Sequence, residues 1–346
     1  MSTDRIIERV TSIDVARLAG VSQSAVSRVF TPGASVSEKT SAKVRVAAEQ
    51  LGYRPNVMAR AMITGKSRII GLVVAYLDNQ FYPLAIERLS LALQSRGYHL
   101  LVFMAGNAIE KVAEVMGELL DHQVDGIITA SVGMSNDLTA RCSAAGIPIV
   151  MFNRGQDDPR LSEVTSDNLA GSRRATEFLL AAEHKRIAHI MGWQGSSTGR
   201  DRAKGFERAM KAAGLIPFAM ADGMYTRETA AAIARDMCSS AKRPDAIFVG
   251  NDHMAFAVMD ELRFGLGLDV PGDVSIIGYD DAPMACWPAY ALTTIRQPID
   301  DMVAATVTAM LDQIDGRDTP RKVRIDGPLI VRRSARCPIG YAAVQA

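Results

Sequence analysis

Four polar side chains near the N-terminus are of types that can hydrogen-bond the edges of nucleic-acid bases. They are the amide of Gln23, the hydroxyls of Ser24 and Ser27, and the guanidinium of Arg28. Amides and hydroxyls pair with several base edges, and a guanidinium fits guanine with two parallel hydrogen bonds. Because Val26 and Val29 alternate with them at helical spacing, we expect all four on the outer face of one short helix. An ordinary αα-hairpin with a polar outer face fits the same pattern.

The residues before this helix predict a helix-turn-helix. Thr11 and Asp14 match a capping box at the start of a first helix. Gly20 can adopt the positive φ of a tight turn, and Ser22 can cap the second helix. The first helix is expected to bury an apolar stripe consisting of Ile13, Val15, Ala16, Leu18 and Ala19.

A third helix should complete this small domain. Ser37 can cap it and Gly52 ends it, with a buried stripe at Val44, Ala47, Ala48 and Leu51. Residues 56–64 then resemble a nine-residue helix. Because isolated helices shorter than about 12 residues are marginal in water, this segment should be ordered only when a dimer twin or a DNA groove packs on it. A flexible linker is the alternative.

The basic charge is concentrated in the same region. Residues 1–66 contain ten Lys or Arg and five Asp or Glu, a net charge of +5, whereas the other residues contain 29 and 33, a net charge of −4. Such an excess is the electrostatic footprint of phosphate contact, although a solvated surface can also carry it. With 346 residues, 48% of them hydrophobic, the chain can form two or three domains.

Several classes of protein are disfavoured by composition. The N-terminus has no apolar leader and no apolar run is long enough to span a bilayer, so we expect a cytoplasmic protein without a membrane partner. The four cysteines are far apart and have no metal-ligand spacing, so they are expected to be buried small apolar residues. We expect neither a metal nor a cofactor.

From residue 68 onward, short apolar strands alternate with amphipathic helices. Strands are predicted at 69–76, 99–104, 126–130 and 148–152, with helices near 81–95, 108–121 and 136–145. The pattern restarts at 186–191 and continues with strands at 246–249 and 274–279. This predicts two doubly wound parallel α/β lobes with a ligand cleft at the carboxyl ends of their strands.

Three other functions fit parts of the sequence less well. Gly195 to Gly199 matches the G-x-S-x-G elbow of hydrolases, with Ser197 as nucleophile, but residues 192–194 separate it from its strand. Gly65-Lys66-Ser67 lacks the earlier glycine of a phosphate loop, because Arg60 stands there. A solute-binding protein without a regulatory role fits the two lobes alone, but it would be exported and would have no use for a DNA-binding region.

Taken together, these motifs resemble the LacI (lactose repressor) family of bacterial transcription regulators. The DNA-binding signature is Thr-x-x-Asp-Val-Ala-x-x-Ala-Gly-Val-Ser-x-x-x-Val-Ser-Arg-Val from Thr11 to Val29. It continues through Leu51-Gly-Tyr-Arg-Pro-Asn56, and later motifs include Gly250-Asn-Asp-x-Met-Ala255 and Val274-Ser-Ile-Ile-Gly-Tyr-Asp-Asp281. The resemblance implies an all-α head, a hinge helix and a two-lobed effector domain like that of periplasmic binding proteins.

The resemblance also implies how the head would bind a pseudo-palindromic operator in double-stranded DNA. Gln23, Ser24 and Arg28 would read bases in the major groove, with Ser27 beside them, while Thr11, Ser22 and Ser37 would contact phosphates. The hinge helix, with Asn56 and Met62, would pair with its dimer twin and enter the minor groove. Met62 occupies the place of the leucine that levers open one base step in the family.

In the second part of the chain, family positions that meet the effector correspond to Phe81, Tyr82, Asn153, Arg202, Tyr225, Asn251, Asp252, Asp280 and Gln297. Amide and charged groups beside aromatic faces suit a sugar or sugar acid. Asp252 and Asp280 could instead cap helices, and Tyr225 and Phe81 could belong to the core. Trp287 is expected near the cleft or packed between the lobes.

The implied organisation is a head at 1–55, a hinge at 56–66 and an effector domain at 67–346. One lobe would comprise about 67–165 and 296–323, and the other about 166–293 and 324–340. Tyr290-Ala291 replaces a Pro-Pro pair that is frequent in the family near the crossover between the lobes. Because no leucine heptads follow residue 330, we expect a homodimer.

Overall fold

The computed structural model describes residues 10–31, 33–54, 66–106, 109–317 and 319–340, and it divides the chain into two compact units, 1–68 and 69–346. The two units are described separately below. The helix predicted at 56–64, with Asn56 and Met62, lies outside the described residues.

The first unit contains α1 (Ser12–Ala19), α2 (Gln23–Val29) and α3 (Glu38–Leu51). Its start and stop signals are confirmed: Thr11 and Asp14 form the capping box, and Gly20 and Gly52 have φ of 63° and 64°. The core consists of Val15, Ala16, Val26, Val44, Ala47 and Ala48. The stripe predicted on α1 was too wide, because Ile13 and Leu18 are 53% and 50% exposed. Only one narrow face of this two-turn helix packs on its neighbours.

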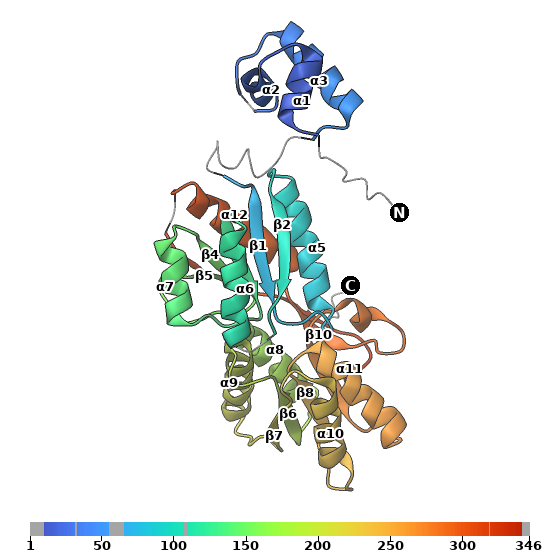
Figure 1. Ribbon diagram of the computed structural model, residues 1–346. Helices are drawn as coiled ribbons and strands as arrows, with labels where there is room; N and C mark the ends of the chain where they lie inside the picture. The colour runs from blue at the N-terminus through green and yellow to red at the C-terminus, as the bar shows by residue number, and fades with distance from the viewer. Residues whose placement is uncertain (1–9, 32, 55–65, 107–108, 318, 341–346) are drawn as a thin grey trace, which may run out of the picture. The chain divides into compact units, whose positions relative to one another are not determined.

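The first lobe of the second unit is a six-stranded parallel sheet in the order β11-β5-β4-β3-β1-β2. Its strands are β1 (Ile69–Val74), β2 (His99–Met104), β3 (Gly126–Ala130), β4 (Ile149–Phe152), β5 (Ser162–Ser166) and β11 (Lys322–Ile325). Figure 1 labels β1, β2, β4 and β5 of this sheet. Helices α5 (Phe81–Gln94) and α12 (Ile299–Ile314) share one hydrophobic core with it. Helices α6 (Ile109–Asp121) and α7 (Asn136–Ala144) border a second core.

The second lobe has the strand order β12-β10-β9-β8-β6-β7, parallel except for the β10-β12 pair. The strands are β6 (Ile187–Met191), β7 (Met220–Asp222), β8 (Ala246–Val249), β9 (Ser275–Asp280), β10 (Thr293–Arg296) and β12 (Leu329–Ile330). Helices α8 (Asn168–Ala181) and α9 (Ser197–Ala212) border one core, and α10 (Arg227–Cys238) and α11 (Asp252–Asp260) border the other. Short helical segments η1 (Glu261–Gly265) and η2 (Pro283–Cys286) follow α11 and β9.

The chain crosses between the lobes after β5, after β10 and after β11. The expected lobe boundary between residues 323 and 324 falls inside β11, which pairs with β5 as far as Ile325. Arg296, assigned to the first lobe, pairs with Asp280 in the second. Strand β5 was not predicted because its sequence Ser-Glu-Val-Thr-Ser is polar, yet every residue of it is buried between β4 and β11.

Two further expectations from the sequence concern the cysteines and membrane-spanning helices. Cys142 and Cys238 are buried as predicted, whereas Cys286 and Cys337 are exposed. Among the residues that the structure describes, no helix combines the length and the apolar character needed to cross a membrane.

Candidate functional site

The predicted base-reading side chains lie together on the exposed face of α2. Gln23, Ser24, Ser27 and Arg28 are all exposed. Gln23 Nε2 donates a hydrogen bond of 3.0 Å to Ser12 Oγ, which ties the start of α2 to α1. Arg28 Nε donates to the carbonyl of Ser24 at 3.4 Å, so the guanidinium lies along its own helix. The face therefore presents amide, hydroxyl and guanidinium groups side by side.

The residues predicted to contact phosphates are all helix caps. Ser22 Oγ accepts the N–H of Ala25 at 3.2 Å, and Ser37 Oγ accepts that of Thr40 at 3.3 Å. The Thr11 hydroxyl donates to Asp14 Oδ2 at 2.7 Å, and the Thr11 N–H donates to the same oxygen. These hydrogen bonds lower the pKa of Asp14. The three residues thus fix where α1, α2 and α3 begin.

In the second unit, the second lobe contains a buried ion pair beside the carboxyl end of β9. Arg202 on α9 is 2% exposed and Asp280, at the end of β9, is 5% exposed. Their closest atoms, Arg202 Nη2 and Asp280 Oδ1, are 3.5 Å apart. Arg202 also donates to Asn168 Oδ1 and to the carbonyl of Gly250, and its guanidinium lies 3.7 Å from the centre of the Tyr279 ring. The arginine is therefore held on all sides.

Asp280 is one of the residues through which the two lobes are hydrogen-bonded. Gln297 Nε2 donates to Asp280 Oδ1 at 2.7 Å, and Asn79 Nδ2, from the first lobe, donates to Oδ2 at 3.4 Å. Burial raises the pKa of Asp280, although these donors and Arg202 oppose the shift. The backbone of Asp280 has a φ of 131°, a strained value for a residue with a side chain.

The first lobe contributes polar groups from the carboxyl ends of its strands. Asn153 and Arg154 follow β4, Ser131 follows β3, and Tyr76 follows β1. Asn153 Nδ2 donates to the Tyr82 hydroxyl at 3.0 Å, and this hydroxyl is also bonded to Ser131 Oγ. Burial raises the pKa of Tyr82 well above its usual value and also raises that of Tyr76. Both phenols are thus neutral hydrogen-bonding groups.

Further contacts join the lobes around this region. The guanidinium of Arg154 lies 5.7 Å from the centre of the Trp193 ring and 5.8 Å from that of Tyr225, both in the second lobe. The Gly155 N–H donates to Ser197 Oγ at 2.9 Å. At another point His253 Nε2 lies 3.5 Å from Asp78 Oδ2. We call the residues that meet here the interlobe cluster; they are Tyr76, Asn79, Tyr82, Ser131, Asn153, Arg154, Trp193, Arg202, Tyr225, Asp280 and Gln297.

Three buried polar atoms of the interlobe cluster have no hydrogen-bond partner in the described part of the chain. They are Asn153 Oδ1, Arg154 Nε and Gln297 Oε1. Because a buried polar atom without a partner costs about 1–3 kcal/mol, such atoms usually serve a ligand or a water molecule. Two of the three are acceptors and one is a donor on a cation.

The structure brings together six of the nine residues predicted to meet an effector: Tyr82, Asn153, Arg202, Tyr225, Asp280 and Gln297. The other three lie elsewhere. Asn251 caps α11 by accepting the Met254 N–H at 3.0 Å. Asp252 is fully buried inside the second lobe, where its oxygens bind the Thr294 hydroxyl and the Ala282 N–H. Phe81 belongs to the first lobe's core, stacked on Phe152.

The same contacts decide between several alternatives that the sequence leaves open. Neither Asp252 nor Asp280 caps a helix; the cap is Asn251. Burial and the neighbouring Asp280 raise the pKa of Asp252 to about 8, which fits a carboxyl group buried inside a lobe. Trp287 is 51% exposed and is therefore not packed between the lobes. Arg154 and Trp193 belong to the cluster but were not among the predicted site residues.

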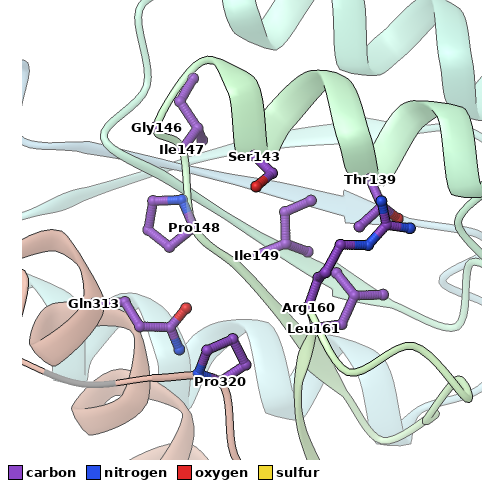
Figure 2. Close-up of a pocket in the computed structure, with 10 residues that line it drawn as sticks. All are labelled: Thr139, Ser143, Gly146, Ile147, Pro148, Ile149, Arg160, Leu161, Gln313 and Pro320. Carbon is purple, nitrogen blue, oxygen red and sulfur yellow. The ribbon is translucent and has the colours of Figure 1, made fainter.

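Two pockets of about 230 Å³ lie near the first lobe. One is lined by residues of both lobes, including Glu163 and Arg324 of the first and Asn168 and Ser197 of the second. It adjoins the interlobe cluster at Asn168, which accepts a hydrogen bond from Arg202. The other lies on the first lobe alone, at the amino ends of β4 and β5, and Figure 2 shows the side chains that line it. Since ligands in such sheets bind at the carboxyl ends of strands, the second pocket is not where an effector is expected.

The hydrolase alternative finds no support in the geometry around Ser197. This residue is the first of α9, and its hydroxyl accepts the Gly155 N–H. Within the described ranges, no histidine is hydrogen-bonded to Ser197, and no group of three or more His, Cys, Asp or Glu side chains could hold a metal ion.

Comparisons with known proteins agree with this arrangement. Residues 12–56 match the model of bacterial regulatory proteins of the lacI family, and residues 176–335 match a periplasmic binding protein-like domain. The chain is 33% identical to the transcriptional regulator CelR of Thermobifida fusca, over 92% of this chain and 96% of that protein. It is 31% identical to the repressor PurR of Vibrio vulnificus, over 93% and 98% of the two chains.

Solved structures give the same result. A complex of CelR with cellobiose aligns with a TM-score of 0.72 at 30% identity, covering 94% of this chain and all of that one. The lac repressor dimer bound to operator and the anti-inducer ONPF aligns with a TM-score of 0.85 at 26% identity, covering 94% and 99%. The helix-turn-helix head, the two parallel-sheet lobes and these matches over nearly the full length show that the chain belongs to the LacI family of bacterial transcription regulators.

Proposed function

We propose that this protein is a dimeric repressor that acts on DNA in the cytoplasm and whose operator affinity is set by a small molecule bound between the two lobes. The observation that carries the proposal is the interlobe cluster. It contains buried polar atoms without partners at the place where both sheets end, in a chain that also has a DNA-binding head. A ligand that binds these atoms would contact both lobes and would therefore favour one arrangement of the lobes.

In the head, Gln23, Ser24, Ser27 and Arg28 are the proposed base-reading residues because they are exposed on one face of α2. Thr11, Ser22 and Ser37 are proposed to position the head on phosphates. The helix at 56–64, with Asn56 and Met62, is proposed to pair with its twin in a dimer and enter the minor groove.

The proposed effector is a sugar or sugar acid. The relatives support this class, since CelR has been solved with cellobiose and the lac repressor with ONPF. The contacting residues are proposed to be Tyr82, Asn153, Arg202, Tyr225, Asp280 and Gln297. Asn251, Asp252 and Phe81 would act indirectly, because Asn251 and Asp252 fix the start of α11 and the loop after β9, and Phe81 packs edge to face on Tyr82.

The proposed mechanism follows from the hydrogen bonds that join the lobes. A ligand that adds bonds between Asn153 in one lobe and Asp280 or Gln297 in the other favours the closed arrangement. A shift of the lobes that is passed on to the hinge would then separate or stabilise the paired hinge helices. Couplings of this kind are typically about 1–3 kcal/mol, or 5- to 150-fold in affinity.

The test uses the full-length protein and a duplex selected by it from a random-sequence library. Fluorescence anisotropy measures the affinity for this duplex alone and with each of a panel of sugars, sugar acids, polyols and nucleobases. We expect selection of a pseudo-palindromic sequence and at least one small molecule that changes its affinity 5- to 150-fold. Failure to select any sequence over random DNA would overturn the proposal, and Arg28→Ala serves as the control for base reading.

A further inference from the structure

Arg154 is a buried cation whose charge is not balanced by an acid. It is 6% exposed. Its Nη1 donates to the carbonyl of Ser131 at 2.6 Å and its Nη2 to the hydroxyl of Tyr76 at 3.4 Å, while Nε has no partner. Both partners are neutral groups. Among the described residues, no Asp or Glu forms an ion pair with it.

Other arginines of the same unit form ion pairs with aspartates. Arg202, equally buried, is paired with Asp280. Arg160, in the same lobe as Arg154, lies 2.6 Å from Asp158 and is partly exposed. Because an uncompensated buried charge costs several kcal/mol, a fold that keeps Arg154 without an acid favours the binding of an anion.

The surroundings of Arg154 indicate what kind of anion this is. The guanidinium lies 5.7 and 5.8 Å from the ring centres of Trp193 and Tyr225 of the other lobe, so an anion bound there lies where the two lobes meet. Arginine can pair with a carboxylate or a phosphate through parallel N–H bonds, but the single charge of Arg154 balances all of the charge of a carboxylate and only about half of that of a phosphate. The two acceptors without partners, Asn153 Oδ1 and Gln297 Oε1, match hydroxyl donors on the same ligand. The set thus complements a molecule that has one carboxylate and several hydroxyls.

We propose that Arg154 binds a carboxylate of the effector, which makes the effector a hydroxylated carboxylic acid of the uronic or aldonic type rather than a neutral sugar. This rests on the proposed function, since it places the effector between the lobes. Arg154 then supplies the charge recognition, and the polar side chains of the cluster bind the hydroxyls.

The first test needs no variant. Isothermal titration calorimetry on the full-length protein compares each acid with a neutral analogue of nearly the same shape: glucuronate with glucuronamide, galacturonate with galacturonamide, and gluconate with glucitol. Glucose, galactose and glucose 6-phosphate complete the panel. We expect one acid to bind about 10- to 150-fold more tightly than its neutral analogue, the range for a hydrogen bond to a charged group.

The second test assigns the preference to Arg154. Arg154→Gln should remove most of the difference between the acid and its analogue, and Arg154→Lys, which keeps the charge but lacks the Nε–H, should retain part of it. Arg160→Gln is the matched control, because it removes the same charge from the same lobe at a distance from the cluster. It should leave the preference unchanged.

The contrary outcomes separate this inference from the proposed function. Tightest binding by a neutral sugar, by the amide or by the phosphate overturns the inference and leaves the regulator function standing. So does an acid preference that persists in Arg154→Gln, or a protein that binds its selected duplex but no acid of the panel. Loss of sequence-specific duplex binding in the unmodified protein instead overturns the proposed function.

Discussion

Asn79, in the loop that follows β1, donates a hydrogen bond from Nδ2 to Asp280 Oδ2 in the opposite lobe, at 3.4 Å. The same side chain accepts the N–H of Phe81 through its Oδ1 at 3.1 Å, so it also fixes the start of α5. Asp280 is held within its own lobe by Arg202 and Gln297. The Asp280 carboxylate thus has two roles: it pairs with Arg202 within the second lobe, and it accepts the hydrogen bond from Asn79 of the first lobe.

Replacing Asn79 by aspartate should push the lobes apart. The new carboxylate keeps the acceptor for the Phe81 N–H but removes the donor to Asp280, and the two carboxylates repel each other while both are ionised. We expect a larger radius of gyration in small-angle X-ray scattering of Asn79→Asp than of the unmodified protein. Asn79→Ala is the control that removes the bond without adding charge, and equal scattering from both variants would contradict a charge effect.

Removing Arg202 should destabilise the second unit strongly. Arg202→Met leaves Asp280 buried without its cation, and breaking a buried ion pair on one side costs about 3–5 kcal/mol. Adding Asp280→Asn removes the orphaned charge, so the double variant should regain at least about 1 kcal/mol of the free energy of unfolding relative to Arg202→Met. Urea denaturation of the two single variants and the double variant measures the coupling. Strictly additive losses would mean that the two side chains do not act as a pair.

The head was largely predictable because its boundaries depend on local signals. Thr11, Ser22 and Ser37 cap their helices through atoms only three residues away, and Gly20 and Gly52 end theirs through their own φ. Burial was harder to predict. Ile13 and Leu18 are apolar residues on α1, but whether they are covered depends on how α3 crosses it, which no pattern within α1 specifies.

The interlobe cluster was predictable only in part. Asn153 follows β4 and Asp280 is the last residue of β9, positions that sequence identifies. Arg154 follows the same strand as Asn153, and this adjacency was the available signal. Its place in the site could not be predicted, because it depends on Trp193 and Tyr225, which approach Arg154 from the other lobe, and on the absence of an ion pair with any acid that the structure describes. Asp252 was predicted to belong to the site but does not. Its carboxylate accepts hydrogen bonds from Thr294 and Ala282, which are distant in sequence, and therefore points into the lobe.

The second lobe should lose stability in mild acid because of His189. This side chain is fully buried between Phe206 and Phe248, and its Nδ1 donates to the carbonyl of Phe248 at 2.8 Å. Burial lowers its pKa from 6.5 to about 4. Below pH 6.5 the unfolded chain therefore binds a proton that the folded chain does not, so stability is full above this pH and falls between 6.5 and 4. The loss from this group amounts to about 3 kcal/mol.

His189→Asn tests this assignment, since its amide nitrogen can replace Nδ1 as donor but does not titrate. The variant will be less stable overall because it fills less space. Its free energy of unfolding, measured with urea at several pH values, should fall less between pH 6.5 and 4 than that of the unmodified protein. Some dependence will remain, because burial also lowers the pKa of His184 and His253. A slope identical to that of the parent would assign the titration elsewhere.

Arg28 and Thr11 should affect DNA binding in different ways. Arg28 is exposed on α2 and is proposed to read a base, so Arg28→Ala should reduce discrimination at one operator position by about 1–3 kcal/mol. Thr11 is proposed to contact a phosphate and also caps α1, so Thr11→Ala should weaken binding to all duplexes alike, with about 1 kcal/mol lost from the cap. Thr11→Ser keeps the hydroxyl and should restore most of the affinity. Anisotropy titrations against the selected operator and its single-base variants distinguish the roles, and a changed base preference in Thr11→Ala would refute the phosphate assignment.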